Sequence, residues 1–74
     1  MDKTLKQEKI KLWKKQEADL EKELGETMKK KGAAAQLGDL SENADYKMYI
    51  EQSEMISARL ALIQKMIKDF EKAA

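Results

Sequence analysis

The sequence predicts an all-α fold, a long antiparallel two-helix coiled-coil hairpin with an acidic tip loop. Its composition is the first reason, because 39% charged and 42% hydrophobic residues with no Pro and only three Gly leave little turn chemistry for a sheet protein. The second is that apolar residues recur at helical spacing in both halves of the chain. The third is a single segment of low charge between those halves. We therefore expect residues 1–74 to form one helical hairpin.

The first predicted helix covers about residues 2–34. Its apolar residues recur at spacings of three, four, five or seven, at Leu5, Ile10, Trp13, Leu20, Leu24 and Met28. Glu17 and Thr27 fall where a strict heptad seam would have apolar residues. A glycine in a helix costs roughly 1 kcal/mol relative to Ala, so we expect the helix to fray near Gly32.

The predicted tip covers about residues 35–41, where the charge density falls and Gly38 follows Gly32. Asp39 or Ser41 is expected to cap the second helix. The run from Asp39 to Glu42 has the spacing of a capping box, in which Glu42 reaches back to the amide of the cap residue. The chain is expected to reverse direction here.

The second predicted helix covers about residues 42–73 and has the cleaner period. Tyr49, Ile56, Ile63 and Phe70 stand seven apart, and two flanks widen this row. One flank is Tyr46, Leu60 and Ile67, and the other is Met48, Met55, Leu62 and Met66. Together they cover roughly 140° of the helix, which is broader than a two-stranded seam. This helix is expected to need a partner along its full length.

The short connector makes the two helices antiparallel neighbours, with an arm of about 45 Å at 1.5 Å per residue. Two helices bury little surface, so marginal stability is expected unless hairpins associate.

The composition also excludes several classes of function. A chain without Cys or His cannot build disulfides, the usual zinc, haem and iron–sulfur sites, or a Ser-His or Cys-His nucleophile. A net charge of +1 gives no overall field that would select nucleic acid or an anionic membrane. No apolar run approaches the roughly 18 residues that span a bilayer, and the amino terminus lacks a signal-peptide core. We expect a soluble, cytoplasmic protein.

The tip is where chemistry is expected. Between Gly32 and Tyr46 the sequence has three acids, Asp39, Glu42 and Asp45, and no basic residue. Two carboxylates three residues apart at a helix start share one side of it and could face one hard cation, such as a magnesium ion that completes its shell with water and phosphate oxygens. The alternative is purely structural: acids in the first turn satisfy free amides and favour the helix dipole.

The exact sequence at the tip also resembles that of a known family. Gly38-Asp39-Leu40-Ser41-Glu42-Asn43-Ala44-Asp45-Tyr46, followed by Glu51-Gln52 and Ala58-Arg59-Leu60, resembles the amino-terminal domain of the bacterial Gre transcript cleavage factors. The recognisable likeness covers roughly residues 38–73. In that family an antiparallel coiled coil enters the secondary channel of RNA polymerase, and its acidic tip assists hydrolysis of backtracked RNA by the polymerase active centre.

The resemblance implies a role for each tip residue. Asp39 and Glu42 match the two acids that hold or position a second Mg²⁺ and its attacking water, jointly with the polymerase and not stably alone. Asp45 matches a third acid, Tyr46 an aromatic tip residue, and Asn43 and Ala44 complete the motif. The backtracked RNA 3′ end is contacted indirectly. The hairpin itself is then not an enzyme, because it assists a catalytic site that belongs to the polymerase.

Two departures from the family pattern bear on this expectation. Relatives often carry basic residues where this chain has Ala35 and Ile50, which affects contacts to the transcript. The family also has a carboxyl-terminal globular domain, and this chain ends at Ala74, where that domain would begin. We expect an excised domain or a naturally short relative, with weak affinity for the polymerase.

Three alternatives stay open. The hairpin could occupy the channel and inhibit synthesis without promoting cleavage. It could be a plain coiled-coil interaction module that self-associates and buries Met48, Met55 and Leu62. Direct nucleic-acid binding ranks lower, because the lysines of the first helix alternate with acids.

Overall fold

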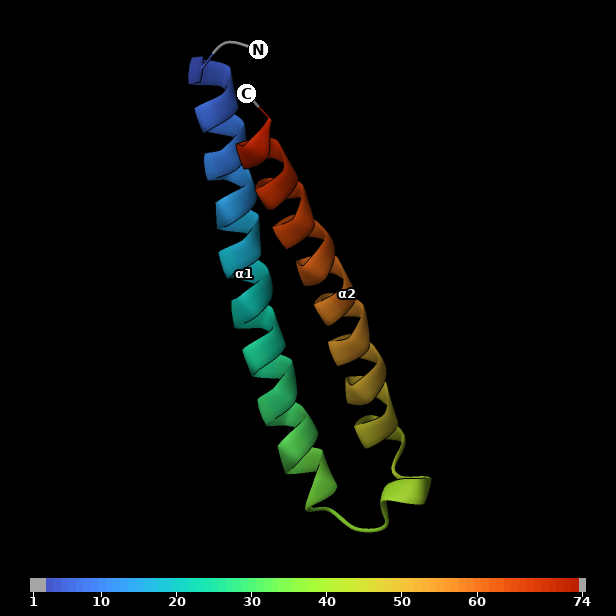
Figure 1. Cartoon of the computed structure of the whole chain (residues 1–74). Coiled ribbons are helices and arrows are strands. Elements are labelled where there is room, and N and C mark those ends of the chain that lie inside the picture. Colours follow the sequence, from blue (N-terminus) through green and yellow to red (C-terminus); the bar gives the residue numbers. More distant parts are fainter. Residues whose placement is uncertain (1–2, 74) are drawn as a thin grey trace.

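The computed structural model describes residues 3–73, apart from the side chain of Ser41. Helix α1 (Lys3–Ala35) and helix α2 (Ala44–Lys72) are joined by a tip that contains a short 3-10 turn, η1 (Leu40–Glu42). The helices run antiparallel and side by side, with both ends of the chain at one end of the molecule and the tip at the other (Figure 1). The Cα trace measures 55 × 15 × 12 Å. Within the described part of the chain the all-α hairpin is confirmed.

Both predicted helices are present, with small shifts in their bounds. The predicted start of the first helix at Asp2 lies outside the described residues, and α2 begins at Ala44 where about residue 42 is predicted. Neither helix, over its described length, is apolar enough to cross a membrane.

The side chains of α1 that face α2 follow a strict heptad. Apart from Ala35 at the helix end, its buried and half-buried positions alternate spacings of four and three: Lys6, Ile10, Trp13, Glu17, Leu20, Leu24, Thr27, Lys31 and Ala34. This corrects the predicted stripe, since Leu5 and Met28 are 57% and 44% exposed. A coiled-coil seam keeps its 3.5-residue period along the whole contact, so Glu17 and Thr27 lie in it despite their polarity.

Helix α2 contributes the matching half of the seam. Its heptad positions are Tyr46, Tyr49, Ser53, Ile56, Leu60, Ile63, Ile67 and Phe70, with Ile50 and Met66 half-buried beside them. Ile56, Ile63 and Ile67 are the best-buried apolar side chains of this helix. The predicted seven-residue row from Tyr49 to Phe70 therefore does face the partner helix. The predicted methionine flank differs, because Met48, Met55 and Leu62 are exposed.

An aromatic pair closes the open end of the hairpin. The rings of Trp13 and Phe70 meet edge to face, with centroids 5.1 Å apart and an interplanar angle of 71°. The ammonium groups of Lys6 and Lys9 lie 5.9 and 5.8 Å from the centre of the Phe70 ring. The Lys6 ammonium also donates a hydrogen bond to the Ala73 carbonyl. A Trp–Phe contact of this geometry contributes about 0.5–1.5 kcal/mol beyond the area it buries and fixes the helix register at this end.

A polar layer interrupts the seam in its middle. Thr27 and Ser53 are the buried polar residues, and the register places them at about the same level of the two helices. The Ser53 hydroxyl donates a hydrogen bond to the Ile50 carbonyl at 2.8 Å. No buried polar side-chain atom among the described residues lacks a partner. The layer therefore carries no unpaired group, although it adds less apolar burial than a pair of leucines would.

The predicted fraying near Gly32 is wrong, because α1 continues through Gly25 and Gly32 to Ala35. A Cβ built on either glycine would have no neighbour within 4 Å, so both positions face open space on the outside of the helix. The helix extends past Gly32 because it is followed by three alanines, the best helix formers, and because Ala34 packs in the seam.

Replacing Gly32 with Ala should raise the free energy of unfolding by about 0.5–1 kcal/mol, because it reduces the freedom of the unfolded chain without a clash. Urea unfolding followed by circular dichroism measures the change. The matched control is Gly38→Ala, which should lower stability by roughly 1 kcal/mol because Gly38 has a positive φ of 139°. Equal effects of the two substitutions would contradict this assignment.

Candidate functional site

The tip begins with a tight reversal at the end of α1. The amide of Gln36 donates to the Ala33 carbonyl at 3.2 Å, and the amide of Leu37 donates to the Ala34 carbonyl at 3.1 Å. Gly38 then takes a φ of 139°, which residues with a side chain rarely adopt. The chain therefore leaves the axis of α1 within three residues and enters the acidic segment.

The acidic segment folds as its own short turn. The Glu42 amide donates to the Asp39 carbonyl at 3.3 Å, and the Asn43 amide donates to the Leu40 carbonyl at 3.4 Å. These bonds define η1 and place Asp39 just before it and Glu42 at its end. The two acids are thus spaced by one 3-10 turn rather than by the first turn of α2.

Asn43 is the residue that caps α2. Its backbone is extended, with φ −87° and ψ 98°, and its side-chain oxygen accepts a hydrogen bond from the Tyr46 amide at 3.0 Å. The predicted capping by Asp39 or Ser41, with Glu42 in a capping box, is therefore wrong. Asp39 lies just before η1 and Glu42 ends it, so both precede the residue that caps α2, and the side chain of Ser41 lies outside the described part of the structure.

The same side chain also ties the two helices together. The Asn43 side-chain amide donates to the Ala34 carbonyl, at the end of α1, at 2.7 Å. Ala34 is buried there, with 4% of its surface exposed. Sequence reasoning included Asn43 only as part of the tip motif and missed this role. A signal was present, because Asn is a preferred cap and directly precedes the helical run Ala44-Asp45-Tyr46.

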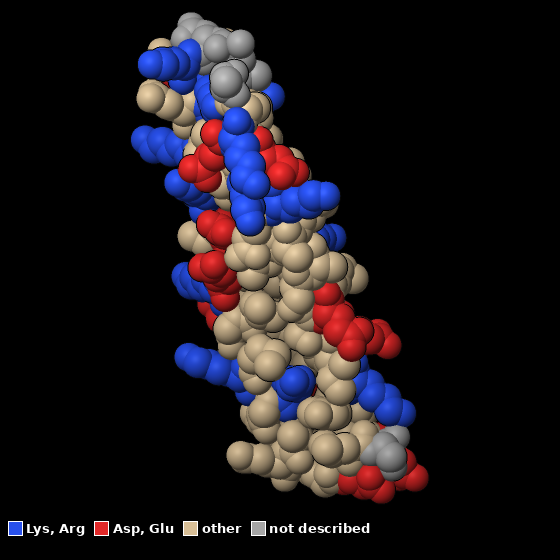
Figure 2. Space-filling model, viewed as in Figure 1, with Lys and Arg blue, Asp and Glu red and all other residues tan. Residues whose placement is uncertain are grey.

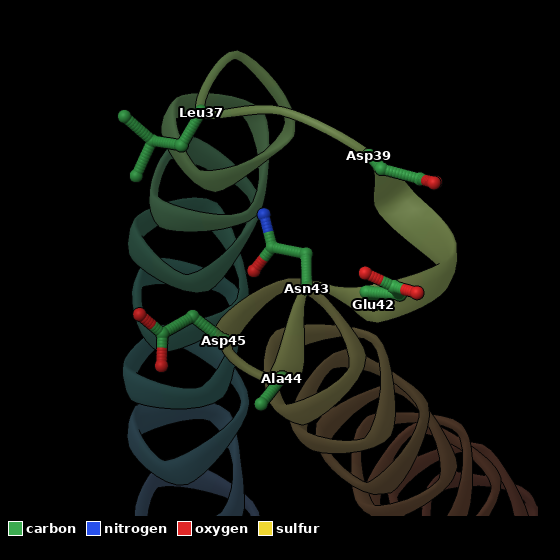
Figure 3. Close-up of a pocket in the computed structure, with 6 residues that line it drawn as sticks. All are labelled: Leu37, Asp39, Glu42, Asn43, Ala44 and Asp45. Atoms are coloured by element: carbon green, nitrogen blue, oxygen red, sulfur yellow. The ribbon is translucent and has the colours of Figure 1, made fainter.

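The three carboxylates of the tip are exposed and lie in two places. Asp39 and Glu42 share one side of the tip, at the two ends of η1, whereas Asp45 lies beyond Asn43 on the side of α1 (Figure 3). An open depression of about 400 Å³ lies between them, lined by Leu37, Asp39, Glu42, Asn43, Ala44 and Asp45. The structure thus brings Asp39 and Glu42 together and keeps the third predicted acid apart from them.

The Asp39 and Glu42 pair fits part of a magnesium site. Carboxylate oxygens are the ligands that Mg²⁺ takes from proteins, and one or two of them are common when water and phosphate oxygens fill the other positions. Among the described residues, no group of three Asp, Glu, His or Cys side chains could hold an ion. The pair could therefore contribute two carboxylates to such an ion.

The remaining predicted tip residues frame this pair. Ala44 is exposed at the first turn of α2, while Tyr46 is half-buried in the seam and donates its amide to Asn43. Ala35 and Ile50 are also half-buried. Acidic side chains gather at the tip end of the space-filling view beside a largely uncharged surface (Figure 2). Residues 36–45 are therefore acidic and apolar, and they include no Lys or Arg that could bind a phosphate group directly.

Comparison with known proteins gives one family. The family model of the amino-terminal domain of GreA and GreB, described as transcription elongation factor, N-terminal, matches residues 4–71. Searches of curated proteins and of solved structures gave no match. The matched range includes both helices nearly in full and the whole tip.

Asn43→Ala should lower the free energy of unfolding by about 1–3 kcal/mol, because it removes the cap of α2 and one of the two hydrogen bonds that the Ala34 carbonyl accepts. Asn43→Ser keeps a side-chain oxygen for the Tyr46 amide and loses the amide donor to Ala34, so its loss should be smaller. Urea unfolding and amide exchange at Tyr46 measure the two effects. An unchanged exchange rate at Tyr46 in Asn43→Ala would contradict the capping role.

Proposed function

The chain belongs to the GreA/GreB family of transcription elongation factors through their amino-terminal domain, and we propose that it stimulates magnesium-dependent cleavage of backtracked RNA from within the secondary channel of bacterial RNA polymerase. Family membership makes it an elongation factor domain that works with RNA polymerase, and a factor domain rather than a catalytic one. The observation that carries the finer proposal is the pair of exposed carboxylates, Asp39 and Glu42, on one side of the tip.

The shape of the hairpin supports insertion. The hairpin is a slender rod, with a Cα trace of 55 × 15 × 12 Å, that carries its acids at one end while both chain ends lie at the other (Figure 1). A narrow channel would admit the tip and leave the basic, aromatic open end outside. The tip would then meet the catalytic centre with its carboxylates foremost.

The chemistry of the tip supports a shared metal. Asp39 and Glu42 would contribute carboxylate oxygens to a Mg²⁺ that the polymerase binds at the same time. When bound, the ion supplies an activated water and stabilises charge in phosphodiester hydrolysis. The hairpin's own contribution is to bring two negative oxygens to that position and to hold them there.

The backbone of the tip supports precise placement. Gly38 reverses the chain, η1 fixes the spacing of the two acids, and Asn43 binds both helices. Positioning groups before binding reduces the entropy lost when the complex forms. The acids are thereby presented by a hydrogen-bonded turn at the end of the two helices.

The test is transcript shortening in a stalled, backtracked elongation complex supplied with Mg²⁺ and excess hairpin. Wild-type protein should release short 3′ fragments, and Asp39→Asn or Glu42→Gln should lower the rate about tenfold or more, because each keeps the side-chain shape and removes a charge at the site of metal binding. Asp45→Asn is the matched control, since it removes a tip charge on the other side of Asn43 and should retain most of the activity.

Two results would contradict the proposal: no fragments with wild-type protein in excess, or full activity in the Asp39 and Glu42 variants. Slower nucleotide addition without fragments would instead identify a channel-occupying inhibitor, for which the shape of the rod is sufficient. Binding to the elongation complex, measured in the same samples, separates a failure to bind from a failure to stimulate cleavage.

A further inference from the structure

Helix α2 carries a second apolar row that the hairpin does not cover. We call it the outer stripe, and it consists of Met48, Met55, Leu62 and Met66. The first three stand seven apart and are 42%, 55% and 60% exposed, while Met66 is half-buried. Gln52 and Arg59 lie in the turns between them, so the row repeats the four and three spacing of the inner seam. Helix α2 therefore has the sequence of a helix that packs on two sides.

The hairpin also leaves more surface exposed than a compact protein of its size. It exposes 5774 Å², and a globular protein of 8.5 kDa exposes roughly 4,700 Å². The excess of about 1,100 Å² is comparable with the roughly 800 Å² that each partner contributes to a standard protein interface. One further packed surface would bring the exposure close to that of a compact protein.

The charges along α2 indicate how a partner would lie. Residues 44–57 carry three acids and one base, and residues 58–72 carry four bases and two acids. The boundary between these halves falls in the middle of the outer stripe. A second α2 laid antiparallel on the first would therefore pair each acidic half with a basic half, whereas a parallel one would oppose like charges.

We infer that the outer stripe is the contact surface for a second copy of this chain, in an antiparallel dimer with a two-fold axis near residue 57. In this arrangement Met48 lies opposite Met66 of the second copy, Leu62 lies opposite Gln52, and Met55 lies opposite Arg59 nearest the axis. A two-fold contact uses the same patch on both chains, as a single continuous stripe allows. The four helices then form a bundle in which α2 is buried on two sides.

The rest of the hairpin agrees with this arrangement. The stripe is centred near the middle of α2, so the two rods overlap along most of their length. Residues 3–15 of α1 carry six lysines and one glutamate, and in the dimer they lie at the same end as the acidic tip of the second copy. The bundle is wider than one hairpin, so dimerisation and entry of a single rod into a narrow channel exclude each other.

Sedimentation of the full chain from about 10 µM to about 1 mM tests the dimer over the range expected of a weak to moderate interface. The weight-average mass should rise from one chain to two. Leu62→Glu should raise the dissociation constant about tenfold or more, because it places a negative charge in the contact opposite the acidic half of the second copy. Met28→Glu is the matched control, since Met28 is 44% exposed on α1 away from the stripe and should leave the constant unchanged.

Cysteine cross-linking tests the orientation, because the chain has no native Cys. Glu51 and Lys65 border the outer stripe and lie opposite each other in the antiparallel dimer. A mixture of Glu51→Cys and Lys65→Cys proteins should form a mixed disulfide faster than either variant alone forms its own. Circular dichroism of all variants confirms that the hairpin remains folded.

A chain that stays monomeric throughout this concentration range overturns the inference, and the stripe then belongs to a different partner. It is also overturned if Leu62→Glu and Met28→Glu dimerise equally well, or if each cysteine variant cross-links best with itself. If Leu62→Glu alone loses its helical content, Met55→Lys, which places a base opposite Arg59 of the second copy, replaces it with Met28→Lys as its control. None of these outcomes depends on whether the hairpin stimulates RNA cleavage.

Discussion

The heptad seam between α1 and α2 is the contact on which the rest of the described structure depends. It sets the antiparallel register, and two local contacts hold that register at its ends: the Trp13 and Phe70 rings at the open end and the Asn43 side chain at the tip. The tip has no core of its own, so its shape follows from where the seam delivers the two helix ends. Exposed ion pairs such as Lys14 with Glu71, whose charged atoms are 4.0 Å apart, contribute little by comparison.

Much of the fold could be predicted from periodicity. The row from Tyr49 to Phe70 identifies the inner face of α2, because its apolar residues repeat without interruption. The first helix is harder to read, since Glu17, Thr27 and Lys31 lie in its seam while Leu5 and Met28 face outward. The packing of both helices together decides which residues of α1 face inward. The positions of the hydrophobic residues on α1 alone do not reveal that face.

The residues of the candidate site could be predicted from the sequence, but the backbone conformation that positions them could not. The string of acids identifies Asp39 and Glu42, and the structure places both on one exposed side of the tip. The sequence pattern predicts the wrong cap residue, because a capping box and a 3-10 turn can share the same spacing. Asn43 directly precedes the first residue of α2. Its hydrogen bond to Ala34 joins residues nine apart in the sequence, and a local sequence motif does not predict a contact of that range.

The hydrogen bond from Asn43 to Ala34 also opposes sliding of one helix along the other. A coiled coil with a regular repeat looks similar to itself after one helix slides by seven residues, so such seams can settle in several phases with nearly equal burial. The Asn43 side chain caps α2 and bonds to Ala34 in the last turn of α1, and this pair of contacts can form in only one register of the two helices. This side chain therefore acts with the Trp13 and Phe70 pair against sliding of the helices, and it acts at the end where a shift would displace the carboxylates.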